Sequence, residues 1–135
     1  MIPARMLICC LLAVLAGCSK QPTTLNHVAG KVFYKGAPLH TGLIVFSPDT
    51  NRGESGKIAF SKIKEDGSFT LNTGDAPGVT AGWYRVTVAA LSGTSSSSEG
   101  GPISLIPDKY RDPEKSLLQC EVKGNHDNHL NFNLD

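Results

Sequence analysis

The chain has 135 residues with a formal charge of +1, and 40% of its residues are hydrophobic. This length is typical of a single domain with one core. Because 13 basic residues nearly balance 12 acidic ones, the composition argues against nucleic acid as a partner and against any partner recognised through an excess of charge.

The N-terminal segment predicts an export signal. Residues 1–5 carry one positive charge, at Arg5, and residues 6–16 contain no charged or uncharged polar side chain. This order of segments is typical of a secretory signal peptide. The apolar run has 11 residues, whereas a helix needs about 20 to cross a bilayer. We therefore interpret residues 1–17 as a cleaved signal rather than as an anchor.

The residues around Cys18 resemble the bacterial lipobox, in which diacylglycerol alkylates the cysteine thiol before cleavage. Leu15, Ala16 and Gly17 precede this cysteine, and only a thiolate-type nucleophile forms the thioether. The alternative is a chance cysteine beside a conventional cleavage site. We expect membrane attachment through lipid on Cys18, since two or three acyl chains hold a protein firmly. Ser19 is not the aspartate that favours inner-membrane retention, so we expect the outer membrane where the cell has one.

Cleavage before Cys18 changes the inventory of the chain. Removing the first 17 of 135 residues leaves 118, with 12 basic and 12 acidic side chains. Two of the four cysteines leave with the signal and Cys18 carries lipid, so Cys120 remains alone and an intrachain disulfide is excluded. We interpret residues 18–26 as the lipidated cysteine and a polar tether.

Beyond the tether the pattern predicts β-strands. Short stretches of alternating apolar and polar residues are separated by Gly, Pro, Asn and Asp, and no stretch has a helical period. The predicted strands are 27–34, 43–48, 56–63, 68–72, 82–91, 117–122 and 129–134. This number is usual for a small two-sheet sandwich. We therefore predict an all-β fold, an antiparallel sandwich of about seven strands in a domain over residues 27–135.

Alternation within these strands predicts which side chains face the core. The predicted inward sets are Tyr84, Val86 and Val88 in 82–91; Phe69 and Leu71 in 68–72; Leu118, Cys120 and Val122 in 117–122; Leu130, Phe132 and Leu134 in 129–134; and Ile58 and Phe60 in 56–63. Asp66 and Gly67 separate two such runs, which predicts a hairpin because glycine accepts a positive φ without penalty.

The stretch L-S-G-T-S-S-S-S-E-G-G, residues 91–101, is rich in serine and glycine. Its composition is typical of a mobile spacer. A binding loop would have the same composition, and this alternative stays open at the level of sequence.

Strand and turn signals recur over nearly the whole predicted domain. They read V-A-G-K-V-F-Y-K-G-A-P-L from Val28, then G-L-I-V-F-S-P, E-D-G-S-F-T-L, G-W-Y-R-V-T-V, I-P-D-K-Y-R-D-P and N-F-N-L. This succession resembles the carboxypeptidase regulatory-like, or transthyretin-like, domain of small bacterial lipoproteins. The resemblance implies a prealbumin-like or immunoglobulin-like sandwich and implies no activity. The hydroxyisourate hydrolases of the transthyretin family end in Tyr-Arg-Gly-Ser, whereas this chain ends in Asn-Phe-Asn-Leu-Asp.

Two groups of residues are candidates for a functional site. His126, Asp127 and His129 suggest metal ligands, but a spacing of three places side chains on opposite faces of a strand, and we expect neither a metal nor another cofactor. Trp83 and Arg85 share the outward face of one strand. We interpret them, next to the loop from Ser92 to Gly101, as the ligand-binding surface, although an aromatic residue there also serves to cover the sandwich.

These observations favour a non-enzymatic binding or structural module, anchored at the cell envelope, with an envelope protein or glycan as its partner. Two alternatives remain. One is an envelope hydrolase or metal-dependent enzyme that uses the region of His126 and His129. The other is a small-ligand carrier of the transthyretin type, an analogy that rests on fold alone.

Overall fold

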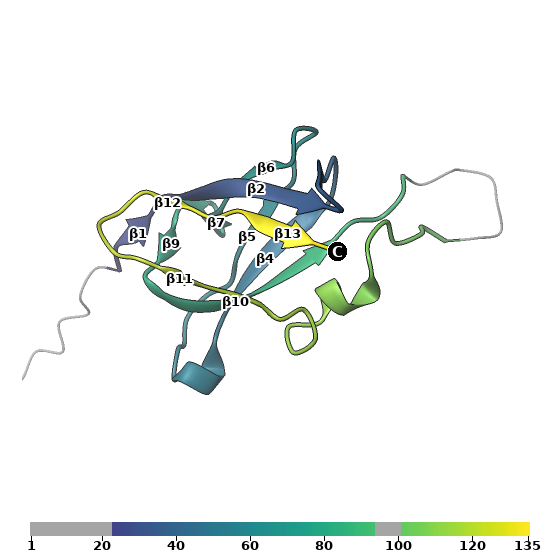
Figure 1. Ribbon diagram of the computed structural model, residues 1–135. Coiled ribbons are helices and arrows are strands. Elements are labelled where there is room, and N and C mark those ends of the chain that lie inside the picture. The colour runs from purple at the N-terminus through teal and green to yellow at the C-terminus, as the bar shows by residue number, and fades with distance from the viewer. Residues whose placement is uncertain (1–22, 94–100) are drawn as a thin grey trace, which may run out of the picture.

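The computed structural model describes residues 23–93 and 101–135 and shows an all-β sandwich (Figure 1). The predicted signal peptide, Cys18 and most of the tether lie outside the described residues, as do residues 94–100 of the predicted spacer. No helix within the described ranges is long and apolar enough to cross a membrane.

The elements follow one another as short strands with two single-turn 3₁₀ helices. The first half contains β1 (Leu25–Asn26), β2 (Val28–Tyr34), β3 (Ala37–Pro38), β4 (Leu43–Pro48), η1 (Thr50–Arg52), β5 (Ala59–Lys62) and β6 (Ser68–Thr70). The second half contains β7 (Asn72–Thr73), β8 (Ala76–Pro77), β9 (Val79–Thr80), β10 (Gly82–Ala89), η2 (Asp108–Arg111), β11 (Leu118–Val122), β12 (Asn128–His129) and β13 (Phe132–Leu134).

Two sheets form the layers of the sandwich. Sheet 1 has the strand order β11-β10-β4-β5-β7-β8, and all of its pairings are antiparallel. Sheet 2 is built around β2, which pairs with β12 and β13 and also with β3 and β6. Figure 1 shows β2 and β13 in one layer and β4 and β10 in the other.

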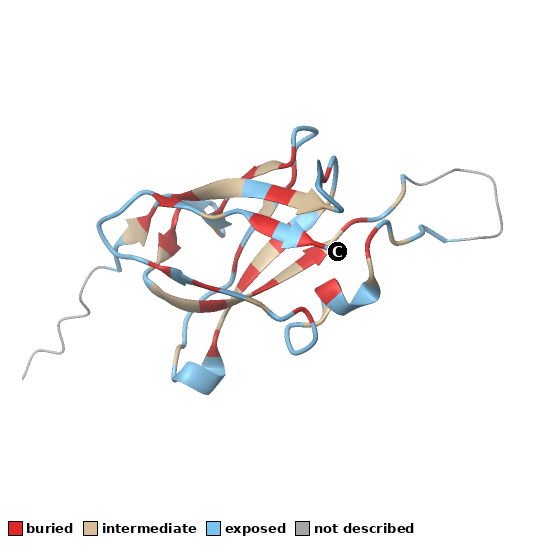
Figure 2. Cartoon of the chain, viewed as in Figure 1, coloured by how far each residue is buried: buried red, intermediate tan, exposed pale blue. Residues whose placement is uncertain are grey.

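The core lies between the two sheets, where buried positions face one another (Figure 2). Tyr84, Val86 and Val88 of β10 point inward, as their alternation predicts. An aromatic cluster occupies the centre: the ring of Phe46 lies 5.9 Å from the rings of both Tyr84 and Phe132, measured between centroids. Aromatic pairs at this separation add to the stabilisation that burial provides.

The inward prediction is also confirmed for Phe69, Leu71, Val122 and Cys120. Burial raises the pKa of the Cys120 thiol to about 12, because the thiolate would lose its hydration. Cys120 therefore behaves as a small apolar side chain of the core.

The prediction that Ile58 and Phe60 face the core is wrong. In β5, Ala59 is fully buried, while Phe60 is 41% and Ile58 is 53% exposed. The register explains the difference, because Ala59 lies opposite Phe46 and cross-strand neighbours share a face of the sheet. A small residue at this position leaves room for the Phe46 ring.

The predicted hairpin at Asp66 and Gly67 is only partly formed. The turn itself is present, with Gly67 at φ +82° and its N–H donating to the carbonyl of Lys64. However, β5 belongs to sheet 1 and β6 pairs with β2 in sheet 2. The first strand after the turn therefore lies in sheet 2, and Asn72 at the end of the same run pairs back with β5, opposite Phe60.

The predicted tether extends to Asn26, but the structure includes Leu25 and Asn26 in β1, paired with β9. Asn26 is 6% exposed. Its side-chain amide donates to the carbonyl of Val79, and its side-chain oxygen accepts from the N–H of Asn125. A polar residue is accommodated here because both ends of its amide have partners.

β2 pairs in parallel with β12 and β13, in contrast to the predicted antiparallel arrangement. After β11 the chain leaves sheet 1 and enters sheet 2 in the same direction as β2. Leu130 and Asn131 interrupt the last strand, and the Leu130 carbonyl lies directly on Gly30. The side-chain oxygen of Asn131 accepts the N–H of Lys31 at 3.0 Å, so the interruption keeps a hydrogen bond to β2.

Gly30→Ala tests this close approach. A Cβ at residue 30 overlaps the carbonyl oxygen of Leu130, and backbone cannot move aside as a flexible side chain does. We expect a loss of about 3 kcal/mol in the free energy of unfolding, measured by chemical denaturation. The matched control is Gly124→Ala, where the nearest atom would be 3.7 Å from the new Cβ and the loss should stay within about 0.5 kcal/mol. Equal stability of the two variants would contradict the assignment.

Candidate functional site: the outer face of sheet 1

Trp83 and Arg85 project from the outer face of sheet 1, and the buried residue Asp49 contacts both of them. Asp49 follows β4 and is only 2% exposed. Its backbone N–H donates to the carbonyl of Trp83 at 2.9 Å, and its Oδ1 accepts the Nε–H of Arg85 at 3.2 Å. Asp49 thus joins the end of β4 to the beginning of β10.

The same carboxylate caps η1. Asp49 Oδ1 accepts the N–H of Asn51 at 3.1 Å, and Oδ2 lies 3.5 Å from Nε of Arg52. The helix ends at Gly53, which has φ +76° and donates its N–H to the carbonyl of Thr50. Because a buried charge is costly unless it is paired, these contacts stabilise Asp49 in place.

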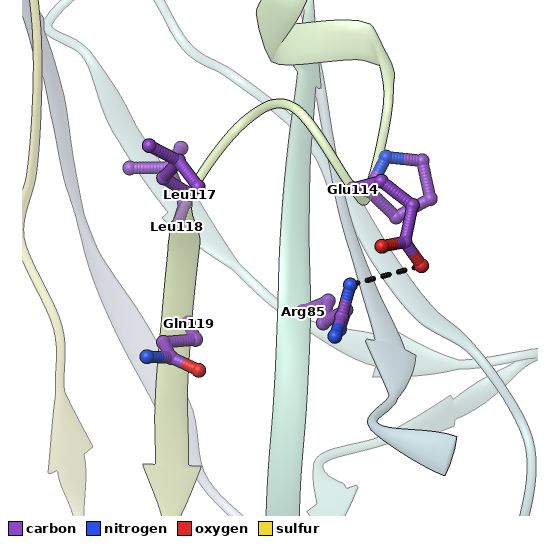
Figure 3. Close-up of a pocket in the computed structure, with 6 residues that line it drawn as sticks. Arg85, Glu114, Leu117, Leu118 and Gln119 are labelled. Carbon is purple, nitrogen blue, oxygen red and sulfur yellow. Dashed lines mark ion pairs between the residues drawn. The ribbon is translucent and has the colours of Figure 1, made fainter. Parts of the chain in front are cut away.

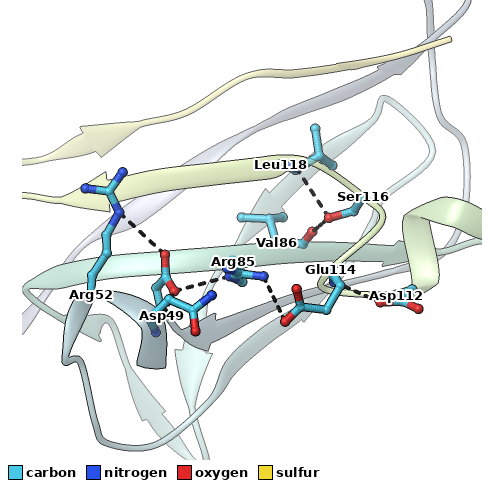
Figure 4. Close-up of polar contacts among 9 residues, drawn as sticks. Asp49, Arg52, Arg85, Val86, Asp112, Glu114, Ser116 and Leu118 are labelled. Atoms are coloured by element: carbon cyan, nitrogen blue, oxygen red, sulfur yellow. Dashed lines mark hydrogen bonds and ion pairs between the residues drawn. The ribbon is translucent and has the colours of Figure 1, made fainter.

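Arg85 links this network to the segment before β11. Its NH1 group lies 3.0 Å from Oε1 of Glu114, so the guanidinium bridges two carboxylates (Figure 4). Hydrogen bonds to Glu114 first and to Asp49 second raise the pKa of Arg85 above its usual value. Arg85 therefore remains charged and oriented on the sheet, with 23% of its side chain exposed.

Trp83 is half-buried, and a cation lies against its indole ring. The guanidinium carbon of Arg52 lies 4.0 Å from the ring centroid, within the range of a cation–π contact. The backbone N–H of Trp83 donates to Oε1 of Glu54 at 3.3 Å. The tryptophan is thus held from its side chain and from its backbone.

The outer face continues across the neighbouring strands. Trp83 lies opposite Glu121 of β11, and Arg85 lies opposite Gln119. Further along the sheet, Val45 lies opposite Phe60, whose ring is exposed because β5 has the register described above. The face therefore combines charged groups at one end with apolar side chains at the other.

A surface cavity of about 290 Å³ lies beside Arg85 (Figure 3). Leu117, Leu118 and Gln119 form one side, and Arg85 with Glu114 forms the other, as Figure 3 shows; Pro113 completes the lining. The cavity is thus located at the junction between the Arg85 ion pairs and β11.

Leu117 in this cavity has an unusual conformation. It is 86% exposed, and its φ of +58° lies in the left-handed region, which disfavours residues with a Cβ. The adjacent Ser116 is buried; its hydroxyl donates to the carbonyl of Val86 at 2.7 Å and accepts the N–H of Leu118 at 3.3 Å. These bonds hold the turn on both sides of Leu117.

The structure does not bring His126 together with Asp127 and His129. The ring nitrogen Nδ1 of His126 lies 2.9 Å from the carbonyl of Gly124 in the turn. His27, which the spacing of the histidines did not bring into the candidate site, lies nearer: its Nδ1 is 4.0 Å from Oδ1 of Asp127, and its ring centroid is 6.4 Å from that of His129. Within residues 23–93 and 101–135, no three His, Cys, Asp or Glu side chains are arranged to hold a metal.

Ser92, where the predicted spacer loop leaves the sheet, lies at the opposite end of β10 from Trp83, and residues 94–100 of that loop lie outside the described residues. β10 runs from Gly82 to Ala89, so Trp83 is at its beginning and Ser92 follows its end. At about 3.3 Å per residue the separation is roughly 30 Å along the strand. The described ends of the loop pair with each other through Leu91 and Ser104.

Sequence reasoning missed the residues that position the face. Asp49 and Arg52 cap and end the short helix η1, Glu114 lies in a loop, and both segments have ordinary turn composition. The stretch D-T-N-R-G contains a capping aspartate and a terminal glycine, which is a signal for a short capped turn but not for a buried ion pair. Nothing in L-L-Q distinguishes Leu117 from a core leucine.

Comparison with known proteins identifies no relative: no protein-family description, curated protein or solved structure matches the chain.

Asp49→Asn tests the network. The amide keeps the shape of the side chain but loses the charge that Arg85 and Arg52 share. We expect a loss of about 1–3 kcal/mol in the free energy of unfolding, measured by chemical denaturation, with a change in Trp83 fluorescence. Asp108→Asn serves as the control, because its pair with Arg111 is exposed and contributes less than about 1 kcal/mol. A stable Asp49→Asn variant with unaltered fluorescence would argue against the network.

Proposed function

We propose that the protein is a lipid-anchored module of the bacterial cell envelope that binds a partner and catalyses no reaction. The location is supported by the signal-like segment and by the lipobox-like Leu15-Ala16-Gly17-Cys18. The resemblance to carboxypeptidase regulatory-like domains, which implies a sandwich without an activity of its own, supports the absence of catalysis.

The observation that carries the binding proposal is the rigid presentation of Trp83 and Arg85 on the outer face of sheet 1. Both side chains are held by ion pairs and a cation–π contact before any partner arrives. Tryptophan and arginine are enriched among residues that dominate binding energies. Side chains that are already ordered lose little conformational entropy on association. An envelope protein or an envelope glycan is the partner we propose.

The enzyme alternative places the chemistry at His126 and His129. Both side chains are exposed, His126 in the turn that precedes β12 and His129 within β12, and His126 contacts the backbone of that turn. A catalytic pair needs a common substrate position and a rigid support. The outer face of sheet 1 meets the second requirement better, which favours binding over catalysis.

Cys18→Ala tests the location. Without the thiol no thioether forms, so the variant should leave the membrane fraction and retain or misprocess its signal segment. Fractionation with intact-mass analysis measures both effects. The control is Cys10→Ala, a cysteine within the apolar run, which should remain membrane-bound. A Cys18→Ala variant that stays in the membrane with an unchanged mass would disprove lipid attachment.

Trp83→Ala tests the binding face. Covalent cross-linking in intact cells should yield a defined adduct with the wild type, and its amount should fall at least about tenfold in the variant, as expected when a buried aromatic anchor is lost. A thermal melt checks that the domain still folds, and His40→Ala, an exposed residue away from this face, is the control. Hydrolytic turnover that disappears in His126→Ala or His129→Ala would instead support the enzyme alternative.

A further inference from the structure

We propose that β11 is a docking edge at which an extended segment of a partner protein adds a strand to sheet 1, with Leu117 as its apolar contact. This inference rests on the proposed binding function and specifies where and how the partner is held.

β11 forms the end of sheet 1, and its pairing leaves backbone groups free. It pairs only with β10 among the described residues, with Cys120 opposite Tyr84. The carbonyl of Trp83 accepts the N–H of Asp49 on the β4 side, whereas the carbonyl of Val86 accepts the hydroxyl of Ser116 on the β11 side. Because successive residues of a strand direct their N–H and C=O groups to opposite sides, Tyr84 bonds toward β11.

The same alternation assigns the free groups on β11. Cys120 directs its backbone groups to β10, so Gln119 and Glu121 direct theirs outward. Both residues are exposed, and their backbone groups have no hydrogen-bond partner in the part of the chain that the structure describes. The next outward N–H, that of Lys123, donates to the side-chain oxygen of Asn128. The open edge therefore consists of residues 119–121, and an extended backbone is the ligand that matches its donors and acceptors.

The conformation of Leu117 supports a binding role for this edge, because neither its exposure nor its backbone angle stabilises the fold. An exposed leucine gains little from burial, and a positive φ is unfavourable for a side chain with a Cβ. Glycine or asparagine would serve the turn better. The side chain instead lines the cavity of about 290 Å³ beside Arg85, which offers space for an apolar side chain of the partner.

Charge indicates the composition of the segment. Glu121 lies at one end of the open edge, opposite Trp83 on β10, and has no ion-pair partner within residues 23–93 and 101–135. A basic residue directly across from Glu121 completes a favourable cross-strand pair. In an antiparallel arrangement, the residue four positions later lies beside Leu117. The partner segment thus carries a lysine or arginine followed four positions later by an apolar residue.

Two variants separate binding from folding. Leu117→Asn removes the apolar contact and suits the left-handed turn, so its melting temperature should equal or exceed that of the wild type. Gln119→Pro removes an outward N–H and leaves the bonds to β10 intact, as proline on an edge strand allows. Gln119→Thr, which keeps the N–H, is the matched control.

The probe is a displayed library of peptides of about ten residues, typical of an added strand with flanks, in which lysine precedes leucine by four positions. The full-length protein, purified in detergent, should enrich peptides from this library and not from one with glutamate in place of lysine. An enriched peptide should slow amide hydrogen exchange at Gln119 and Glu121. It should bind Leu117→Asn and Gln119→Pro at least about tenfold more weakly than the wild type or Gln119→Thr.

No enrichment, or a peptide that leaves the amides of Gln119 and Glu121 unprotected, would overturn the edge proposal. So would undiminished binding to both edge variants, or a lower melting temperature of Leu117→Asn, which would make Leu117 structural. Concentration-dependent protection of the same amides without peptide would assign the edge to a second copy of this chain. If the cross-linked adduct depends on Trp83 while the edge variants bind the peptide normally, the proposed binding function stands and only the assignment of β11 as the docking edge is wrong.

Discussion

The buried charge of Asp49 is the constraint on which the outer face of sheet 1 depends. One carboxylate caps η1, pairs with Arg52 and Arg85, and sits on a residue whose own N–H holds β10. Through Arg85 the network reaches Glu114 and so the segment that leads into β11. The buried carboxylate thus connects the Trp83 and Arg85 positions on β10 with the Glu114 side of the cavity.

The network also explains why the charged side chains of this surface adopt one defined arrangement. An isolated surface ion pair contributes little, because both side chains lose conformational freedom and water screens the attraction. Here the central acceptor is buried and the arginine bridges two acids, which favours one geometry over many. The result is a preorganised surface on a domain whose core is supplied separately by the aromatic cluster around Phe46.

Sequence periodicity was sufficient for the fold class and for most inward-facing residues. It succeeded in β10, where inward apolar residues alternate with outward ones, and it failed at β5, where Ile58, just before the strand, continues into Ala59 and Phe60 as an unbroken apolar run. In such a run alternation does not tell which residues face the core. Here the bulky Phe46 on the neighbouring strand lies opposite Ala59, which makes Ala59 the inward residue. The pairing of sheets was likewise beyond local signals, since the turn at Gly67 has the same chemistry whether it joins strands or sheets.

The candidate site was only half accessible to sequence reasoning. Alternation placed Trp83 and Arg85 together on the outward face, but their partners come from segments 36 and 29 residues away in the chain. Leu117 could not be singled out, because its importance lies in a backbone angle and in exposure, which composition does not encode.

The parallel pairing of β2 with β13 has a consequence for how the chain acquires its fold. Lys31 and Asn131, which bond across this pairing, are 100 residues apart, and contacts of such long range form slowly because a large loop must close first. In a chain that is synthesised from its N-terminus, β2 therefore lacks its partner β13 until the last strand has been made. Sheet 2 therefore closes late, when β13 becomes available to pair with β2.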